Sequence, residues 1–372
     1  MAIPSINPRD LEVFAPPLGE QRLADYLTGL LERHHIDVER MAVRPERDNV
    51  IARLDGRDPS RTLLLECHTD TVAVEGFVGD PFGPVERDGR LYGRGACDTK
   101  AQIAAMVTAL IERAGAGTPP YNVVLAATVG EEWNYLGIAA LIETGVRADW
   151  AVVGEPTELT VVRAHKGSVR LRCTTEGLAA HSSNPAAGAN AIYRMARVLG
   201  VLERHASDLA AGQGHPELGP PTLSVGSIHG GRDVNVVPDE CVIEIDRRLI
   251  PGESPDPVAD GIARVVCDEP SIDFPIRFET VGRDIPMEVA ADSAVVRGVC
   301  KACEAALGTS CVGVVPYGTD ASKLVAVGVP SVVLGAGSVR QAHTVDEYVE
   351  IAQVHQVTDV FRRLLSEDTF TL

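Results

Sequence analysis

Apolar runs of strand length recur along the first part of the chain and alternate with stretches of helical periodicity. The runs cover residues 49–54, 62–66, 121–128 and 150–153, and the helical stretches cover 21–34, 100–114 and 138–144. Short apolar runs between helices are typical of buried strands in a parallel sheet. Up to about Arg163, the chain is therefore expected to form a largely parallel, helix-covered sheet.

The middle of the chain follows a different order of elements. The pattern predicts a strand over 168–175, a helix over 189–209, strands over 222–228 and 241–249, a helix over 257–267 and a strand over 272–280. This β-α-β-β-α-β order is that of a ferredoxin-like unit. After residue 284 the α/β pattern returns, with a helix over 293–307 and a strand over 329–334. We therefore expect an α/β domain formed by residues 1–165 and 284–372, interrupted by an inserted ferredoxin-like α+β domain over 166–283.

Composition narrows the possible partners and the location. The length of 372 residues suits about two domains at ~150 residues each. With 52 acidic and 34 basic residues the net charge is -18, which argues against nucleic acid and anionic membranes as partners. No apolar run approaches the ~20 residues that span a bilayer, and the start of the chain does not resemble a signal peptide. A cytoplasmic location is expected, and the eight scattered cysteines show no disulfide framework.

Residues able to ligate a metal follow four of the predicted strands. His68 follows the run 63–67, Glu131 and Glu132 follow 123–127, Glu155 follows 151–154, and His343 comes after 331–335. Ligands of an open α/β sheet bind beyond the carboxyl ends of its strands, so these side chains are expected to converge.

A further carboxylate, Asp98, lies in the glycine-rich segment 91–100, directly before a predicted helix. Each of these residues also has an ordinary structural explanation: Asp98 as a helix N-cap, Glu131 and Glu132 as a solvated pair, and a lone histidine as a hydrogen-bonded residue. Taken together, two histidines and three carboxylates suit a hydrolytic pair of zinc ions with water in the open positions.

Five motifs in a fixed order carry a family resemblance. They are His68 to Val72, Gly93 to Lys100, Glu131-Glu132, Gly154 to Thr157 and Gln341 to His343. This set, which spans nearly the whole chain, resembles the zinc-dependent amidohydrolase and metallopeptidase family that includes acetylornithine deacetylase, succinyl-diaminopimelate desuccinylase, aminoacylase and glutamate carboxypeptidase. The family usually has an aspartate before the paired glutamates, whereas this chain has Gly130.

The resemblance implies a role for each residue of the site. Asp98 would bridge two zinc ions, His68 and Glu155 would complete one site, and Glu132 and His343 the other. Glu131 would be the general base, and Asp70 would orient the ring of His68. Cobalt or manganese would accept the same ligands. The larger, discontinuous domain would then be the catalytic domain.

The resemblance also implies a role for the inserted domain, which would join two subunits into a homodimer. His181, within 177–183, would reach the partner subunit's active site and donate to the oxyanion. Arg248, within 246–251, resembles an arginine that meets a substrate carboxylate, and Asn235 and Thr319 resemble further substrate contacts. Lys166 is another candidate. Each of these could instead be a structural strand, turn or loop residue.

The function expected from these motifs is hydrolysis of the amide bond of a small-molecule N-acyl amino acid. The motifs are most similar to those of acetylornithine deacetylases, so deacetylation of N-acetylornithine or a related N-acetyl amino acid is the first expectation. Removal of succinate from N-succinyl-diaminopimelate and carboxypeptidase or dipeptidase activity remain open. A two-metal phosphoesterase would surround the metals with a cluster of basic residues, and no such cluster lies beside these motifs. A non-catalytic metal-binding relative would not need Glu131.

Overall fold

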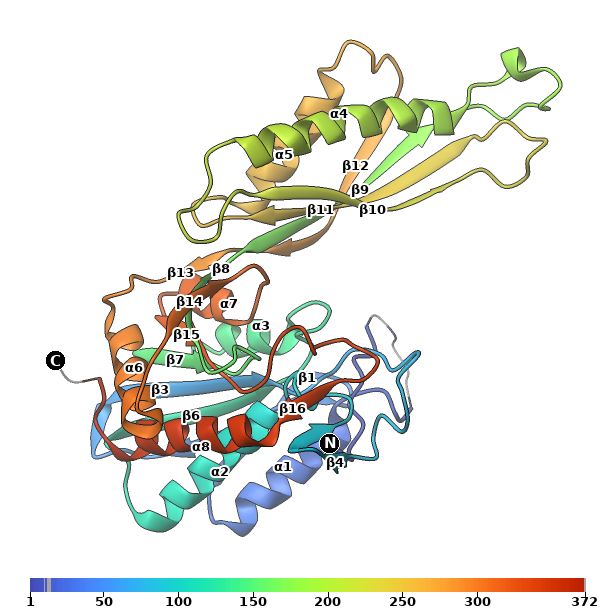
Figure 1. Cartoon of the computed structure of the whole chain (residues 1–372). Helices are drawn as coiled ribbons and strands as arrows, with labels where there is room; N and C mark the ends of the chain where they lie inside the picture. Colours follow the sequence, from blue (N-terminus) through green and yellow to red (C-terminus); the bar gives the residue numbers. More distant parts are fainter. Residues whose placement is uncertain (10, 12–14, 371–372) are drawn as a thin grey trace. The chain divides into compact units, whose positions relative to one another are not determined.

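The computed structural model describes residues 1–9, 11 and 15–370 and divides into two compact units (Figure 1). The first comprises Met1–Arg163, Glu288–Gly313 and Thr319–Leu372, and the second Ala164–Met287 and Val314–Gly318. The boundaries expected from the sequence are 165/166 and 283/284. The unit boundaries lie instead at 163/164 and 287/288, inside strands β8 (Val161–His165) and β13 (Met287–Glu288). The sequence also did not indicate that 314–318 belong to the second unit, where the Val315 carbonyl accepts the Lys166 N–H.

The first unit is built on a mixed sheet. Among the described residues nine strands form it, in the order β1-β2-β6-β3-β7-β15-β8-β13, with β14 beside β8. Their bounds are β1 (Asp37–Arg44), β2 (Arg47–Leu54), β3 (Asp58–His68), β6 (Tyr121–Thr128), β7 (Trp150–Val153), β14 (Val312–Val315) and β15 (Ser331–Val333). The central strands β6, β3, β7 and β15 are parallel, and β1 and β2 are added antiparallel. The predicted α/β class with a largely parallel sheet is confirmed.

Helices cover both faces of this sheet (Figure 1). On one face lie α1 (Gln21–Arg33), α2 (Lys100–Ala116), α6 (Ala294–Leu307) and α8 (Ile351–Ser366), and on the other α3 (Leu136–Glu143) and α7 (Ala321–Ala326). Leu63, Leu65 and Cys67 of β3 join the first set of helices in one buried cluster. Because side chains alternate along a strand, Glu66 and His68 point to the opposite face. A small second sheet pairs β16 (Tyr348–Glu350) with β5 (Arg90–Tyr92), and β5 with β4 (Val85–Arg87).

The second unit has the predicted β-α-β-β-α-β order. Its elements are β9 (Gly167–Glu176), α4 (Ala191–Ala211), β10 (Thr222–Gly230), β11 (Glu240–Leu249), α5 (Pro255–Cys267) and β12 (Ile276–Asp284). The strands form an antiparallel sheet in the order β10-β11-β9-β12. Helices α4 and α5 lie on one face of it and close a separate core (Figure 1). In the described part of both units, no helix has the length and apolar character required to cross a membrane.

Candidate metal centre

Three neighbouring parallel strands end beside one another and deliver most of the predicted ligands. His68 is the last residue of β3 and pairs in register with Thr128, the last residue of β6. Glu131 and Glu132 follow β6, and Glu155 follows β7, whose last residue pairs with β3. Since parallel strands that end in register present their following residues at the same edge of the sheet, these side chains meet there.

Asp98 makes contacts on two sides. Its Oδ1 lies 2.9 Å from Nε2 of His68, and its Oδ2 lies 3.3 Å from Nε2 of His343. Glu155 Oε1 lies 3.5 Å from the same nitrogen of His68, and Glu132 Oε2 lies 3.0 Å from that of His343. The structure therefore brings the five predicted ligands together as two half-sites that share Asp98.

Glu131 belongs to the same cluster. One ligand atom each from His68, Glu131 and Glu155 lie within 4.8 Å of one another, as do one each from His68, Asp98 and Glu132. Burial raises the pKa of Glu131 and of Glu155 well above the ordinary value, and it raises the pKa of Glu132 to about 7. Neighbouring negative charges act in the same direction. The cluster therefore holds more carboxylates than can readily ionise side by side without cations.

These carboxylates raise the pKa of both histidines. Hydrogen bonds with Asp98 and Glu132 raise the pKa of His343 to about 10. Burial lowers the pKa of His68, but the charge of Glu155 and hydrogen bonds with Asp70 and Asp98 outweigh it and raise that pKa well above the ordinary value. For the acid Asp98, burial has the opposite effect and raises the pKa. Hydrogen bonds from both histidines outweigh it and hold the pKa of Asp98 below its usual range. Positive charge is strongly favoured in this cluster.

The cluster fits a pair of divalent cations. Glu132 Oε1 is buried and has no hydrogen-bond partner among the described residues, although a carboxylate oxygen in that setting requires a donor or a cation. Four carboxylates (Asp98, Glu131, Glu132 and Glu155) surround two imidazoles, so two divalent ions would balance their charge. Imidazole and carboxylate ligands suit zinc, cobalt and manganese alike.

Asp70 is fully buried and fixes the turn that carries the paired glutamates. Its Oδ1 accepts the backbone N–H groups of Gly130 and Glu131 at 3.0 and 3.1 Å, and its Oδ2 accepts that of Glu132 at 3.0 Å. His68 Nδ1 lies 3.0 Å from the backbone carbonyl oxygen of Asp70 and 3.4 Å from its carboxylate. The carbonyl is thus the nearer acceptor that leaves Nε2 of His68 available as a ligand atom, and the carboxylate mainly positions the turn.

The absence of the family's usual aspartate at Gly130 has a local explanation. Gly130 has a φ of +81°, a conformation that glycine adopts without strain. A Cβ at this position would lie 3.0 Å from Nη2 of Arg47, which forms a buried ion pair with Glu20. The space beside the turn is therefore already taken by a guanidinium.

Asn7 is a contact of the site that the sequence did not reveal. Its side-chain Nδ2 donates to Oδ2 of Asp70 at 2.6 Å, and the residue is buried. The segment around it runs beside the loop after β3: Asn7 N–H donates to the Thr71 carbonyl and Thr71 N–H donates to the Ser5 carbonyl. No motif or spacing marks an asparagine so far along the chain from its partner, so only the fold could identify it.

Thr319, predicted to contact substrate, is fully buried at the start of α7. Its hydroxyl accepts the N–H of Ala321 at 3.2 Å, and its carbonyl accepts the hydroxyl of Ser322 at 3.0 Å. Burial raises the pKa of the next residue, Asp320, and that of Glu66 in β3, and the charge of Asp320 adds to the effect on Glu66. These contacts give the Thr319 segment a structural role.

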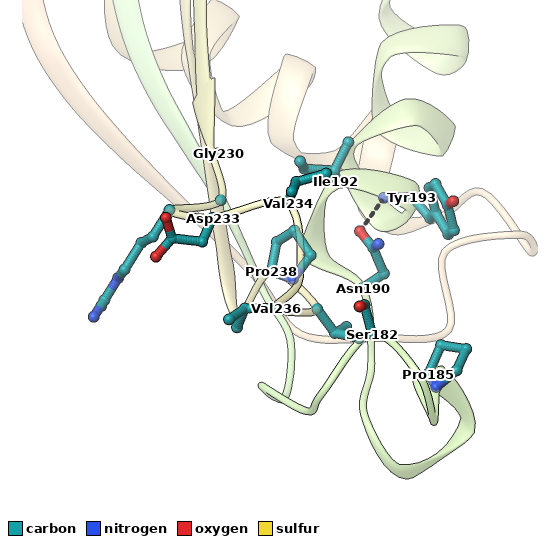
Figure 2. Close-up of a pocket in the computed structure, with 13 residues that line it drawn as sticks. Ser182, Pro185, Asn190, Ile192, Tyr193, Gly230, Asp233, Val234, Val236 and Pro238 are labelled. Atoms are coloured by element: carbon teal, nitrogen blue, oxygen red, sulfur yellow. Dashed lines mark hydrogen bonds between the residues drawn. The ribbon is translucent and has the colours of Figure 1, made fainter.

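In the second unit, the predicted residues His181 and Asn235 lie on adjacent segments. Ser182 N–H donates to the Asn235 carbonyl at 2.9 Å, and His181 pairs with Val236 in an isolated bridge. These segments border a pocket of about 790 Å³ (Figure 2), where the Asn190 side chain accepts the N–H of Tyr193 and caps α4.

The exposed ring of His181 has a defined tautomer when neutral. Ser183 N–H donates to its Nδ1 at 3.1 Å, and Ser183 Oγ lies 2.7 Å from the same nitrogen. Since Nδ1 accepts, the proton of the neutral ring is on Nε2, which can donate outward.

The remaining two predicted contacts differ in exposure. Arg248 is half-buried, and its Nε donates to Asp246 at 2.8 Å, whereas the preceding Arg247 is buried in an ion pair with Glu253. Of these two arginines, Arg248 is the one open to a ligand. Lys166 is buried, and its Nζ donates to the Pro220 carbonyl at 2.6 Å, which provides a structural use for its ammonium.

Comparison with known proteins agrees with the motifs. A family model described as peptidase family M20/M25/M40 matches residues 64–367. An acetylornithine deacetylase of Myxococcus xanthus is 34% identical over 356 residues, covering 92% of this chain and 91% of that protein. One from Vibrio cholerae is also 34% identical, over 359 residues, covering 94% of this chain and 91% of its own length.

Solved structures of similar fold include two metal-dependent peptidases. The M20 family metallo-carboxypeptidase Sso-CP2 of Sulfolobus solfataricus aligns with a TM-score of 0.79 at 19% identity, covering 98% of this chain and 96% of that one. The YXEP protein of Bacillus subtilis, described as a dinuclear metal binding peptidase from the M20 family, aligns with a TM-score of 0.70 at 16% identity, covering 93% and 92%. The family expected from the sequence is confirmed: the chain belongs to peptidase family M20/M25/M40.

Proposed function

We propose that this chain is a two-metal amidohydrolase that releases acetate from N-acetylornithine or a closely related N-acetyl amino acid. The observation that carries the proposal is the placement of Asp98 between His68 and His343, with Glu131 in the same cluster. The identity of 34% to acetylornithine deacetylases over nearly the full length supports the choice of substrate.

In this proposal His68, Glu155 and Asp98 hold one metal, and Asp98, Glu132 and His343 hold the other, with zinc as the expected ion. When bound, the metals would polarise the amide carbonyl and acidify a water molecule. Glu131 takes a proton from the attacking water as the C–O bond forms. It then gives that proton to the leaving amine as the tetrahedral intermediate collapses and its C–N bond breaks. The partly buried position of Glu131, which raises its pKa, suits a group that must both accept and donate a proton.

The second unit supplies substrate contacts in the same proposal. His181, whose neutral ring carries its proton on Nε2, donates to the oxyanion of the tetrahedral intermediate in the active site of the partner subunit. Arg248 binds the substrate carboxylate. Asn235 and Lys166 of this unit, and Thr319 of the first unit, are further candidates for contacts with substrate. Two copies associate through this unit as a homodimer, a proposal supported by the position of β10 at the edge of its sheet and by its exposed Ile228.

A substrate panel tests the proposal. The zinc-loaded protein should hydrolyse N-acetylornithine with a kcat/KM at least roughly tenfold above those for N-succinyl-diaminopimelate, a dipeptide and a generic phosphate ester. In parallel, Glu131→Gln should retain zinc and lose roughly 100-fold or more in kcat, the scale of general-base contributions. A preference for the dipeptide or the succinyl compound would replace the substrate assignment. Full activity of the Glu131→Gln variant would remove the role of Glu131.

A further inference from the structure

Glu347 is a fully buried carboxylate outside the proposed ligand set that receives four hydrogen bonds. Its Oε1 accepts the backbone N–H groups of Cys97 at 2.8 Å and Asp98 at 3.0 Å. Its Oε2 accepts the N–H of Gly95 at 3.0 Å and Nη1 of Arg94 at 2.7 Å. One side chain therefore binds the turn that presents Asp98 at three of its backbone amides.

These hydrogen bonds meet a requirement of the turn itself. Helix α2 begins at Lys100, and its N-cap Thr99 makes no side-chain capping bond. The amides just before a helix have no partner within it, and a buried amide without an acceptor costs free energy. Glu347 supplies the acceptor, and its charge strengthens each bond.

Glu347 also joins the Asp98 turn to the segment that carries His343. It lies four residues after His343, and its backbone carbonyl accepts the N–H of Gly93 at 3.0 Å. The following residues, Tyr348 to Glu350, pair with β5. Glu347 thus holds the segment 93–98, which carries Asp98, to the segment that carries His343. The same two segments are joined by the contact between Asp98 Oδ2 and His343 Nε2.

We propose that Glu347 is a positioning residue that sets the Asp98 turn in its metal-binding form and fixes it to the His343 segment, so that both metals depend on it. The inference rests on the proposed two-metal site. Asp98 must direct its two carboxylate oxygens toward different histidines, and a shift of its backbone would move both at once. Partners that orient metal ligands typically contribute roughly 10- to 100-fold in metal affinity.

A matched pair of variants tests this role. Glu347→Gln replaces one accepting oxygen by an NH₂ group that cannot accept the N–H donors of the turn. Glu350→Gln, three residues further on, removes the same charge from a half-exposed carboxylate that contacts Arg90 at 2.8 Å. Zinc affinity and stoichiometry of the full-length, metal-stripped proteins are measured by calorimetry against a competing chelator. Amide hydrogen exchange of peptides covering 93–100 is followed in the same metal-free samples.

The expected result is zinc affinity weakened roughly 10- to 100-fold at both sites in Glu347→Gln, with faster exchange over 93–100, and wild-type values in Glu350→Gln. A purely structural role would lower the thermal midpoint without changing zinc affinity, and that result would overturn the inference. If Glu347→Gln does not fold, Glu347→Asp, which keeps both oxygens on a shorter side chain, should still weaken zinc binding several-fold. Wild-type affinity in that variant would also overturn it.

Neither the zinc-affinity measurement nor the hydrogen-exchange measurement uses a substrate. The role of Glu347 and the proposed function can therefore be refuted independently. A wild-type protein that binds two zinc ions but hydrolyses none of the panel leaves the role of Glu347 standing and removes the proposed function. An active enzyme whose Glu347→Gln variant binds zinc normally leaves the proposed function standing and removes the role of Glu347.

Discussion

At the scale of single residues, the candidate site depends on side chains that hold backbone as much as on the ligands themselves. Asp70 accepts three consecutive backbone N–H groups of the turn from Gly130 to Glu132, which aims both glutamates into the cluster. A carboxylate buried this deeply is stable only while its oxygens keep their donors. The side-chain amide of Asn7 donates a further hydrogen bond to Asp70 and completes that set.

Replacing Asn7 should therefore reduce both stability and turnover. Asn7→Ala removes the donor 2.6 Å from Asp70 and should lower the free energy of unfolding by about 1–3 kcal/mol, the cost of a buried acceptor left short of a donor. Loosening of the glutamate turn should also reduce kcat roughly tenfold. Denaturant titration and steady-state kinetics with N-acetylornithine measure the two effects. Gln21→Ala, which removes an exposed amide–carboxylate contact with Asp25, is the control and should change neither. An unaltered kcat in Asn7→Ala would count against this role.

At the scale of elements, the meeting of His68, Glu132 and Glu155 could be predicted because these residues end or follow strands whose pattern is plain in the sequence. The runs at 121–128 and 150–153 match β6 and β7 residue for residue. Their strong apolar character follows from burial on both faces of the sheet, and parallel packing then brings their ends together. The same pattern could not reveal β8 and β13. The first is five residues long and includes Arg163 and His165, and the second is only two residues long. Nor could it identify Asn7 or Glu347, whose roles depend on contacts made only in the folded chain.

The two units have separate cores, and a core variant of one should leave the other unaffected. Leu171 of β9 is fully buried in the core of the second unit. Leu171→Ala should destabilise that unit by about 2–5 kcal/mol, the usual cost of this truncation in a packed core. Hydrogen exchange of peptides from 167–284 should report the loss, while zinc affinity of the first unit stays at the wild-type value. Arg170→Ala, an exposed neighbour on the same strand, serves as the control. A comparable loss of zinc affinity in Leu171→Ala would show that the units are not independent.

At the scale of the whole molecule, the crowded carboxylates should make the metal-free protein less stable as the pH rises. The pKa of Glu132 is raised from 4.5 to about 7, and that of His343 from 6.5 to about 10. A raised folded-state pKa means that the folded chain keeps a proton that the unfolded chain has released. The associated stability is therefore full below the unfolded pKa and is lost as the pH rises through the folded one.

The chelator-treated protein should accordingly lose unfolding free energy as the pH rises from 5 to 9. Saturating zinc should remove or reverse this trend, because metal ligands bind in their deprotonated forms. Denaturant titrations across this range, with and without zinc, measure the difference. Metal-free stability that stays constant or increases over the range would contradict the assigned pKa shifts.

The interrupted layout of the first unit has a consequence for biosynthesis. The second unit lies entirely within residues 164–318, whereas β15, His343 and α8 come later in the chain. Because a ribosome delivers the polypeptide from its N-terminus, the ferredoxin-like insert is fully translated while the sheet around it still lacks the strand that sits beside β7. Four of the five proposed metal ligands are therefore synthesised before His343, while the sheet that carries them is still incomplete.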